Sequence, residues 1–138
     1  MMKVFIDTSA FISYFLKRDI LHKESIEKFN FYKRQNAIFL TSSFIIDELF
    51  TWFCTKKTRF DLEKVINAIS NMEETRAIKV FYIDKFICGK AKEILIKFSE
   101  HRISFTDATT YVLYKDFSID EIFTLDSDFK KMRLKTSF

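Results

Sequence analysis

Hydrophobic and polar positions follow two periods along the chain, and the order of these periods predicts the fold. Short apolar runs rich in β-branched and aromatic residues predict strands, whereas apolar residues spaced three and four apart predict helices. The strands are expected over residues 3–7, 37–41, 77–83 and 121–125, with a weak fifth strand over 134–136. The helices are expected over residues 9–17, 23–35, 43–55, 60–72, 84–99 and 107–114, with a short helical turn over 126–131.

Alternation of strands and helices is typical of an α/β fold with a parallel, helix-covered sheet. The chain of 138 residues contains no linker, repeat or low-complexity tract, so residues 1–138 are expected to form one domain. We therefore predict a central parallel sheet of about four to five strands flanked by helices. In such sheets, ligands bind outside the carboxyl ends of the strands.

Four acids from separate segments are expected to meet at that edge. Asp7 ends the first strand and Asp126 follows the fourth, so both point into one crevice if those strands are neighbours. Glu48 lies in the second turn of the helix after the second strand, and Asp107 lies at a helix start. Clustered carboxylates repel one another unless cations or protons neutralise them. Oxygen ligands of this kind suit Mg²⁺ or Mn²⁺, which support phosphodiester hydrolysis as one ion or as a pair.

Each acid also has an ordinary structural interpretation when it is taken alone. Asp7 is a candidate N-cap, Asp107 is favourable near a helix N-terminus, Glu48 fits an exposed helix face, and Asp126 fits a turn. Asp128 precedes a short helix, where it is expected to cap backbone N–H groups or to reach a metal through water. Only the joint arrangement of the four acids therefore indicates a site.

Charge points to a polyanionic partner or to a plain basic surface. Lys and Arg total 23 against 19 Asp and Glu, for a formal net charge of +4. A basic body around an acidic pocket suits a nucleic acid. Two basic clusters are candidate contacts for such a polyanion, with solvated faces as the alternative: Lys56, Lys57 and Arg59, and Lys130, Lys131 and Arg133.

Cysteine usage and hydropathy bear on compartment and assembly. Cys54 and Cys88 are far apart in apolar stretches, which predicts buried free thiols and a cytoplasmic protein. Asp7 interrupts the apolar N-terminal run, and no stretch is long enough to span a membrane, so no membrane association is expected. The 18 Phe residues favour either a Phe-rich core or an apolar interface, as in a homodimer or a complex with another protein.

The segments FIDTSAF, TSSFIIDEL, SFTDATTYVL and IFTLDSDFKKM resemble the PIN domain in their order and spacing, across residues 4–133. They look most like the PIN-domain toxins of type II, VapBC-like toxin–antitoxin systems. The chain departs from that pattern in its glycines: Gly89 is the only one, and those common near the family's C-terminal end are missing. The resemblance implies metal-binding roles for Asp7, Glu48, Asp107 and Asp126, polar lining roles for Thr8, Ser9 and Thr124, and a nearby additional acid in Asp128.

The function expected from these observations is an Mg²⁺- or Mn²⁺-dependent endoribonuclease, acting as a toxin with RNA as substrate and a small antitoxin as partner. Two alternatives remain. A structure-specific DNA nuclease shares acidic clusters, although the chain has little room for a DNA-clamping subdomain. A non-catalytic RNA- or protein-binding module is disfavoured because all four acids are present.

Overall fold

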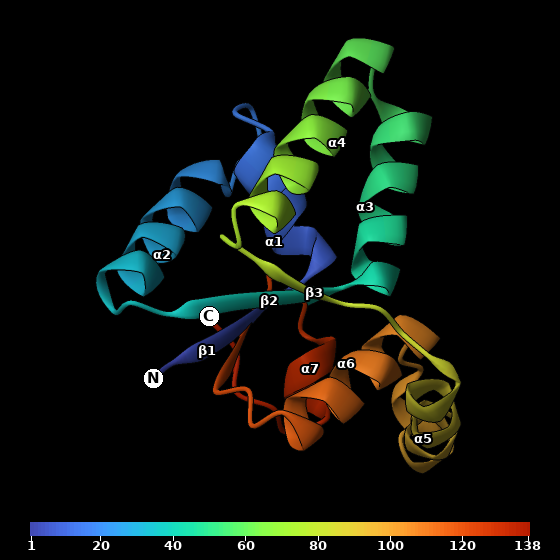
Figure 1. The fold of residues 1–138 in the computed structure, drawn as a ribbon. Coiled ribbons are helices and arrows are strands. Elements are labelled where there is room, and N and C mark those ends of the chain that lie inside the picture. Colours follow the sequence, from blue (N-terminus) through green and yellow to red (C-terminus); the bar gives the residue numbers. More distant parts are fainter.

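The computed structural model describes residues 1–138 as a central parallel sheet with helices on both faces (Figure 1). The strands are β1 (Lys3–Ile6), β2 (Ile38–Ser42), β3 (Lys79–Phe81) and β4 (Glu121–Phe123). The helices are α1 (Thr8–Phe15), α2 (His22–Arg34), α3 (Ser43–Lys56), α4 (Arg59–Glu74), α5 (Lys85–Lys97), α6 (Phe105–Asp116) and α7 (Asp128–Lys131), with a 3₁₀ turn at Ser99–His101. The predicted α/β class and the four main strands are confirmed.

The strand order is β3-β2-β1-β4, so β1 lies between β2 and β4. Phe5 of β1 is level with Leu40 of β2 and with Ile122 of β4, and all three side chains are buried. Helices α1 to α4 cover one face of the sheet, and α5 to α7 cover the other (Figure 1). The first and fourth strands are therefore neighbours, which is the condition for Asp7 and Asp126 to point into one crevice, and their carboxyl ends meet at one edge.

The weak fifth strand predicted over 134–136 is wrong as a strand, because only Thr136 forms a bridge, parallel to Ile122. The backbone nevertheless follows β4 closely. The N–H of Ile122 donates to the carbonyl of Lys135, and the N–H of Ser137 donates to the carbonyl of Ile122, both at 2.9 Å. We call residues 134–138 the strap, since they lie along the free edge of β4.

Tight turns in a chain with one Gly and no Pro require other residues to adopt positive φ. Asn36 and Ser118 do so, as short polar side chains often can, but Arg76, Arg102 and Arg133 do so as well. Each costs of the order of 1 kcal/mol of backbone strain. The surrounding helices determine these turns, since each directly follows a helix or a 3₁₀ turn.

Both cysteines are free, as predicted, but their predicted burial is wrong: Cys54 is exposed on α3, and Cys88 is half-buried on α5. An apolar sequence neighbourhood does not bury a residue whose helix turns it to solvent.

None of the helices combines the length and the apolar character that crossing a membrane requires.

Candidate active site at the carboxyl edge of the sheet

Asp7 lies at the centre of the carboxyl edge, directly after β1, and is buried. It occupies the N-cap position of α1, yet its carboxylate makes no capping hydrogen bond. Its Oδ2 instead accepts a hydrogen bond from Thr124 Oγ1 at 2.8 Å and a longer one from Ser9 Oγ at 3.3 Å. Both hydroxyls reach the same oxygen, so Oδ1 is the oxygen without a hydroxyl donor. This arrangement disfavours the purely capping interpretation of Asp7.

The protein environment opposes a negative charge on Asp7. Its pKa is raised from 3.8 to about 7. Burial is the largest cause, because a carboxylate removed from water loses its hydration. The nearby carboxylates of Asp107 and Glu48 add to the rise, whereas hydrogen bonds from the Thr124 hydroxyl and the Thr8 backbone N–H oppose it. The metal-free site is therefore protonated or electrostatically strained near neutral pH.

Asp107 has both a structural and an electrostatic role at the start of α6. Ser104 caps the helix by accepting from the N–H of Asp107 at 3.0 Å, and Asp107 Oδ2 accepts from the N–H of Ser104 at 3.3 Å. This capping box is the physical reason that the SFTD sequence begins a helix. Burial, followed by the charges of Asp126 and Asp128, raises the pKa of Asp107 to about 6.

Glu48 projects from α3 toward the start of α1. Its Oε1 accepts a hydrogen bond from Thr8 Oγ1 at 2.7 Å, and its side chain is half-buried. Ser42 places α3 by capping it, with its Oγ accepting from the N–H of Ile45 at 3.3 Å. Each polar residue predicted to line the site thus donates a hydrogen bond to one of the acids: Thr8 to Glu48, and Ser9 and Thr124 to Asp7.

The helix cap expected from Asp128 is wrong. Asp126 is the residue that binds a backbone donor, since its Oδ1 accepts from the N–H of Asp128 at 2.9 Å. Asp128 makes no helix cap and instead pairs with Lys131, with Oδ1 and Nζ 3.0 Å apart. The short turn after β4 brings the residue two positions ahead into reach of Asp126, which is an Asx-turn. Both acids still lie close enough to Asp107 to raise its pKa.

The donor set fits a hard divalent cation. It consists of oxygen atoms, and Asp7 and Asp107 carry raised pKa values that a bound cation would reverse. No group of three Asp, Glu, His or Cys side chains lies in an arrangement that could hold one ion. Mg²⁺ commonly uses one or two carboxylates and keeps several waters, so this chemistry does not require such a trio.

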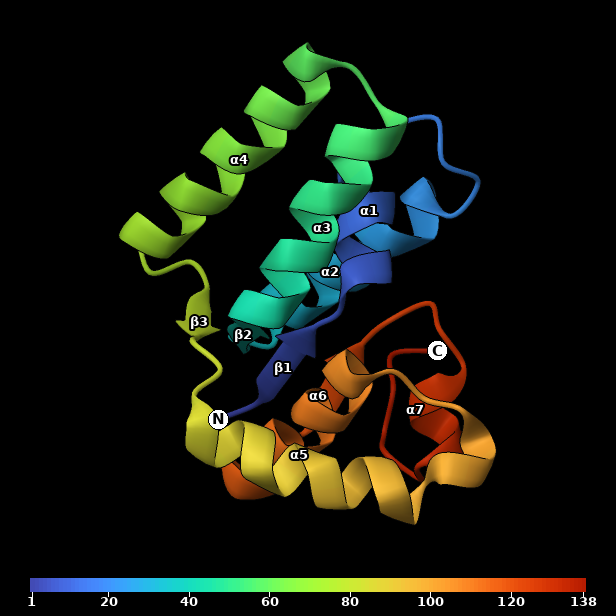
Figure 2. The same ribbon diagram turned by 90° about the vertical axis from the view of Figure 1, so that its right-hand side faces the viewer.

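The two candidate basic clusters lie in different places. Lys56, Lys57 and Arg59 surround the turn between α3 and α4, at the end of this helix pair farthest from the sheet (Figure 2). Along α3 this turn lies about 12 Å beyond Glu48. Lys130 belongs to α7, directly after the turn that carries Asp126, and makes no ion pair in the structure.

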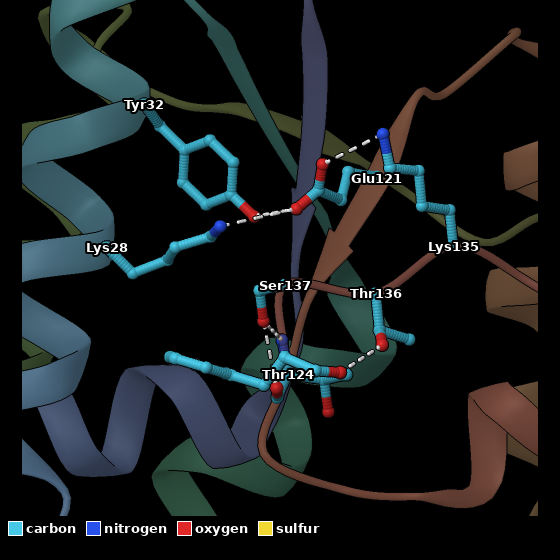
Figure 3. A network of polar contacts seen from close by, with 8 residues as sticks. Lys28, Tyr32, Glu121, Thr124, Lys135, Thr136 and Ser137 are labelled. Atoms are coloured by element: carbon cyan, nitrogen blue, oxygen red, sulfur yellow. Dashed lines mark hydrogen bonds and ion pairs between the residues drawn. The ribbon is translucent and has the colours of Figure 1, made fainter.

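Sequence reasoning missed a second set of residues that support Thr124. Ser137 Oγ accepts from the N–H of Thr124 at 3.1 Å and donates to its carbonyl at 3.0 Å, so the strap holds both backbone groups of Thr124 (Figure 3).

At the other end of β4, the buried Glu121 accepts from the Tyr32 hydroxyl at 2.6 Å and lies 3.7 Å from Lys28 and from Lys135. No local sequence signal marks these contacts, because each joins distant segments.

Comparison with known proteins gives a consistent picture. The PIN domain family model matches residues 4–135. VapC20 of Mycobacterium tuberculosis, a sarcin–ricin loop cleaving toxin, has a similar structure, with a TM-score of 0.81, 18% identity and 95% of each chain covered. PAE2754 from Pyrobaculum aerophilum is similar over 94% of this chain and 86% of its own, with a TM-score of 0.51 and 16% identity. No curated protein matches the chain.

Proposed function

Because the chain belongs to the PIN domain family, we propose that it is a metal-dependent endoribonuclease that hydrolyses RNA phosphodiester bonds. The observation that carries this proposal is the state of Asp7, a buried carboxylate surrounded by other acids and held on one oxygen by two hydroxyls. A carboxylate in that state is suited to binding a cation. Its similarity to VapC20 favours a toxin as its biological role.

The residues of the chain position the acids so that little reorganisation accompanies the reaction. Thr124 Oγ1 donates to Asp7 and accepts from the N–H of Asp126 at 3.0 Å, so a single hydroxyl fixes one acid and the turn that carries another. Ser9 Oγ accepts from the N–H of Leu125 at 2.9 Å and orients its proton toward the same carboxylate. Asp7, Glu48, Asp107 and Asp126 would hold one or two ions of Mg²⁺ or Mn²⁺, with Asp128 acting through water. When bound, the metal supplies an activated water and stabilises the developing charge on the phosphoryl group.

Cleavage of RNA by the purified chain is expected to require Mg²⁺ or Mn²⁺ and to stop in excess EDTA, because the bound metal would supply the activated water and the charge stabilisation that carboxylates alone do not provide. The measurement follows labelled single-stranded RNA on a gel, with metal restored after chelation as the control for irreversible damage. A duplex or branched DNA substrate tests the structure-specific DNA nuclease alternative. Undiminished RNA cleavage in EDTA would rule out the metal mechanism.

The separation of the basic clusters predicts unequal roles in RNA binding. Replacing Lys130 and Arg133 with Ala is expected to weaken binding several-fold and to reduce the slope of log affinity against log salt by about one to two, since each phosphate contact releases counterions. Replacing Lys56 and Lys57 with Ala is the matched control, with the same change of charge at a remote position. Equal effects of the two double variants on binding and salt slope would contradict this assignment.

The partners proposed are cytoplasmic RNA, a small antitoxin protein and a second copy of the chain. Large exposed apolar side chains favour protein contacts, among them Ile20, Phe60 and Tyr82, which are 91%, 66% and 65% exposed. The similarity to a toxin supports an antitoxin as one occupant of such surfaces.

For the second copy, the exposed face of α5 is the best candidate. Gly89 is exposed near its middle, and a Cβ added there would meet no atom within 4 Å, so nothing inside the chain requires a glycine. A glycine within a helix costs about 1 kcal/mol relative to Ala but lets another backbone approach closely. Lys85 and Glu93 lie four residues to either side. In an antiparallel pair of α5 helices centred on Gly89, each Lys85 would face the Glu93 of the other copy.

Replacing Gly89 with Cys is therefore expected to give a disulfide-linked dimer on mild oxidation, and replacing it with Trp should shift the protein to monomer. Light scattering and non-reducing gels measure the two effects. Exposed Cys54 is replaced by Ser in all variants, and a Cys substitution at exposed Ser70 on α4 is the matched control. If the Cys variants at 89 and 70 crosslink equally, α5 is not the interface.

A further inference from the structure

A pocket of about 300 Å³ adjoins the candidate active site and shares Thr124 and Asp126 with it. Its other walls come from α7, which directly follows Asp126, and from two distant parts of the chain, the start of α2 and the strap. Such a volume is at the lower end of the range for small-molecule sites. It is large enough for one flat ring system.

One wall of the pocket is apolar and aromatic. Phe138 and Leu21 line it, and they remain 47% and 39% exposed, so neither side chain is buried by the fold itself. The ring of Phe138 lies 6.5 Å from the ring of the buried Phe123, which supports it from behind. A phenyl group presented in this way offers a stacking surface for a planar ligand.

The polar wall carries a carboxylate without a protein partner. Glu24 lines the pocket, is exposed, and takes part in none of the ion pairs of the structure. Lys130 also lines the pocket and is equally unpaired. The pocket therefore combines an aromatic surface, a free acceptor and a free cation beside the acids of the site.

The strap connects the aromatic wall to the candidate site. Ser137 binds both backbone groups of Thr124, and the next residue is Phe138, whose carbonyl accepts from Thr136 Oγ1 at 2.9 Å (Figure 3). Thr124 in turn donates to Asp7. The backbone that carries the phenyl ring is thus connected through Thr124 to the carboxylate at the centre of the site.

We propose that this pocket binds a single unpaired nucleobase of the RNA substrate, next to the bond that is cleaved, and that it selects guanine. The proposal rests on the ribonuclease function proposed above. Phe138 stacks on the base, as aromatic side chains do in recognition of single-stranded RNA. Glu24, an acceptor only, fits guanine because guanine alone presents adjacent ring and exocyclic N–H donors on its pairing edge. Lys130 contacts a flanking phosphate.

The test measures binding rather than cleavage, so its outcome does not depend on catalysis. Fluorescence anisotropy in EDTA compares labelled oligoribonucleotides of uridine that carry one central guanosine, adenosine, cytidine or inosine. The wild-type chain is expected to prefer guanosine about fivefold over the other three, because only guanine presents both N–H donors to Glu24. Inosine tests this directly, since it differs from guanosine only by lacking the exocyclic amino group. Phe138→Leu keeps the apolar packing but loses the stacking face, and it should weaken binding of every oligonucleotide about tenfold.

Two further variants separate recognition from folding. Glu24→Gln should abolish the guanosine preference while leaving the affinity for the other oligonucleotides within about twofold, and Phe138→Trp should retain binding. Phe60→Ala, at another exposed phenyl on α4, is the matched control and should bind like the wild type. Equal binding of all oligonucleotides by the wild type, absence of binding, or a guanosine preference that survives in Glu24→Gln would overturn the proposal. If the preference is found but the chain does not cleave RNA with any metal, guanine binding by the pocket is supported and the ribonuclease proposal fails.

Discussion

Replacing Asp7 with Asn is expected to lower the rate of RNA cleavage at least about 10³-fold, which corresponds to ~4 kcal/mol of lost transition-state stabilisation. Asn keeps the size of the side chain and an oxygen that accepts from Thr124, but it removes the charge that would hold the cation. The variant should therefore fold normally. Single-turnover cleavage at saturating Mn²⁺ and calorimetric titration of Mn²⁺ together measure the loss.

Asp47→Asn is the matched control for this experiment. Asp47 precedes Glu48 on α3 but is exposed, and it forms none of the ion pairs of the structure, so its replacement should leave cleavage and metal binding unchanged. If Asp7→Asn retained more than about a tenth of the wild-type rate, a loss of less than ~1.4 kcal/mol, Asp7 would not be a metal ligand in the reaction.

The second large effect concerns stability. Without metal, the free energy of unfolding is expected to fall by about 5 kcal/mol between about pH 4.5 and about pH 7.5, of which about 3 kcal/mol comes from Asp7. The pKa of Asp7 is raised to about 7 and that of Asp107 to about 6, whereas both lie near 3.8 in the unfolded chain. Between these values the folded state binds more protons than the unfolded state. The stabilisation is therefore complete below about pH 4 and is lost as the pH rises through the folded-state values.

Urea unfolding in EDTA across this pH range measures the effect. Asp7→Asn should flatten most of the profile and should be more stable than the wild type at about pH 7.5, because it removes a buried charge. Saturating Mn²⁺ should restore stability to the wild type at the same pH, since a cation binds the ionised form. A metal-free wild type that gains stability as the pH rises from 4.5 to about 7.5 would show that the acids are not strained in this way.

Much of the fold could be predicted because its signals are local. The spacing of apolar residues within a segment sets which face it buries, so the position and type of each helix and the four main strands followed from residues a few places apart. Asp7 could be placed at the sheet edge for the same reason, because a strand's last residue lies where the strand ends. The predicted strand over 134–136 failed because a strand also depends on its partner, and the strap meets β4 at a single bridge.

The roles of individual side chains depended on tertiary contacts. The sequence suggested that Asp128 binds a backbone N–H, but the turn after β4 gives that role to Asp126, and Asp128 pairs with Lys131. Likewise, no sequence motif marks the contact of Ser137 with Thr124. Ser137 satisfies the backbone N–H and carbonyl of Thr124, and this role depends on packing between distant segments.

The amino-acid sequence by itself determined the α/β alternation, the family resemblance and the set of acids. Only the tertiary structure decided which oxygen of Asp7 is held, how strongly its charge is opposed, and that Glu24 and Phe138 face one pocket. The reason is physical: helix and strand formation depend on neighbours along the chain, whereas desolvation, charge repulsion and cavities depend on distances between segments that only packing brings together.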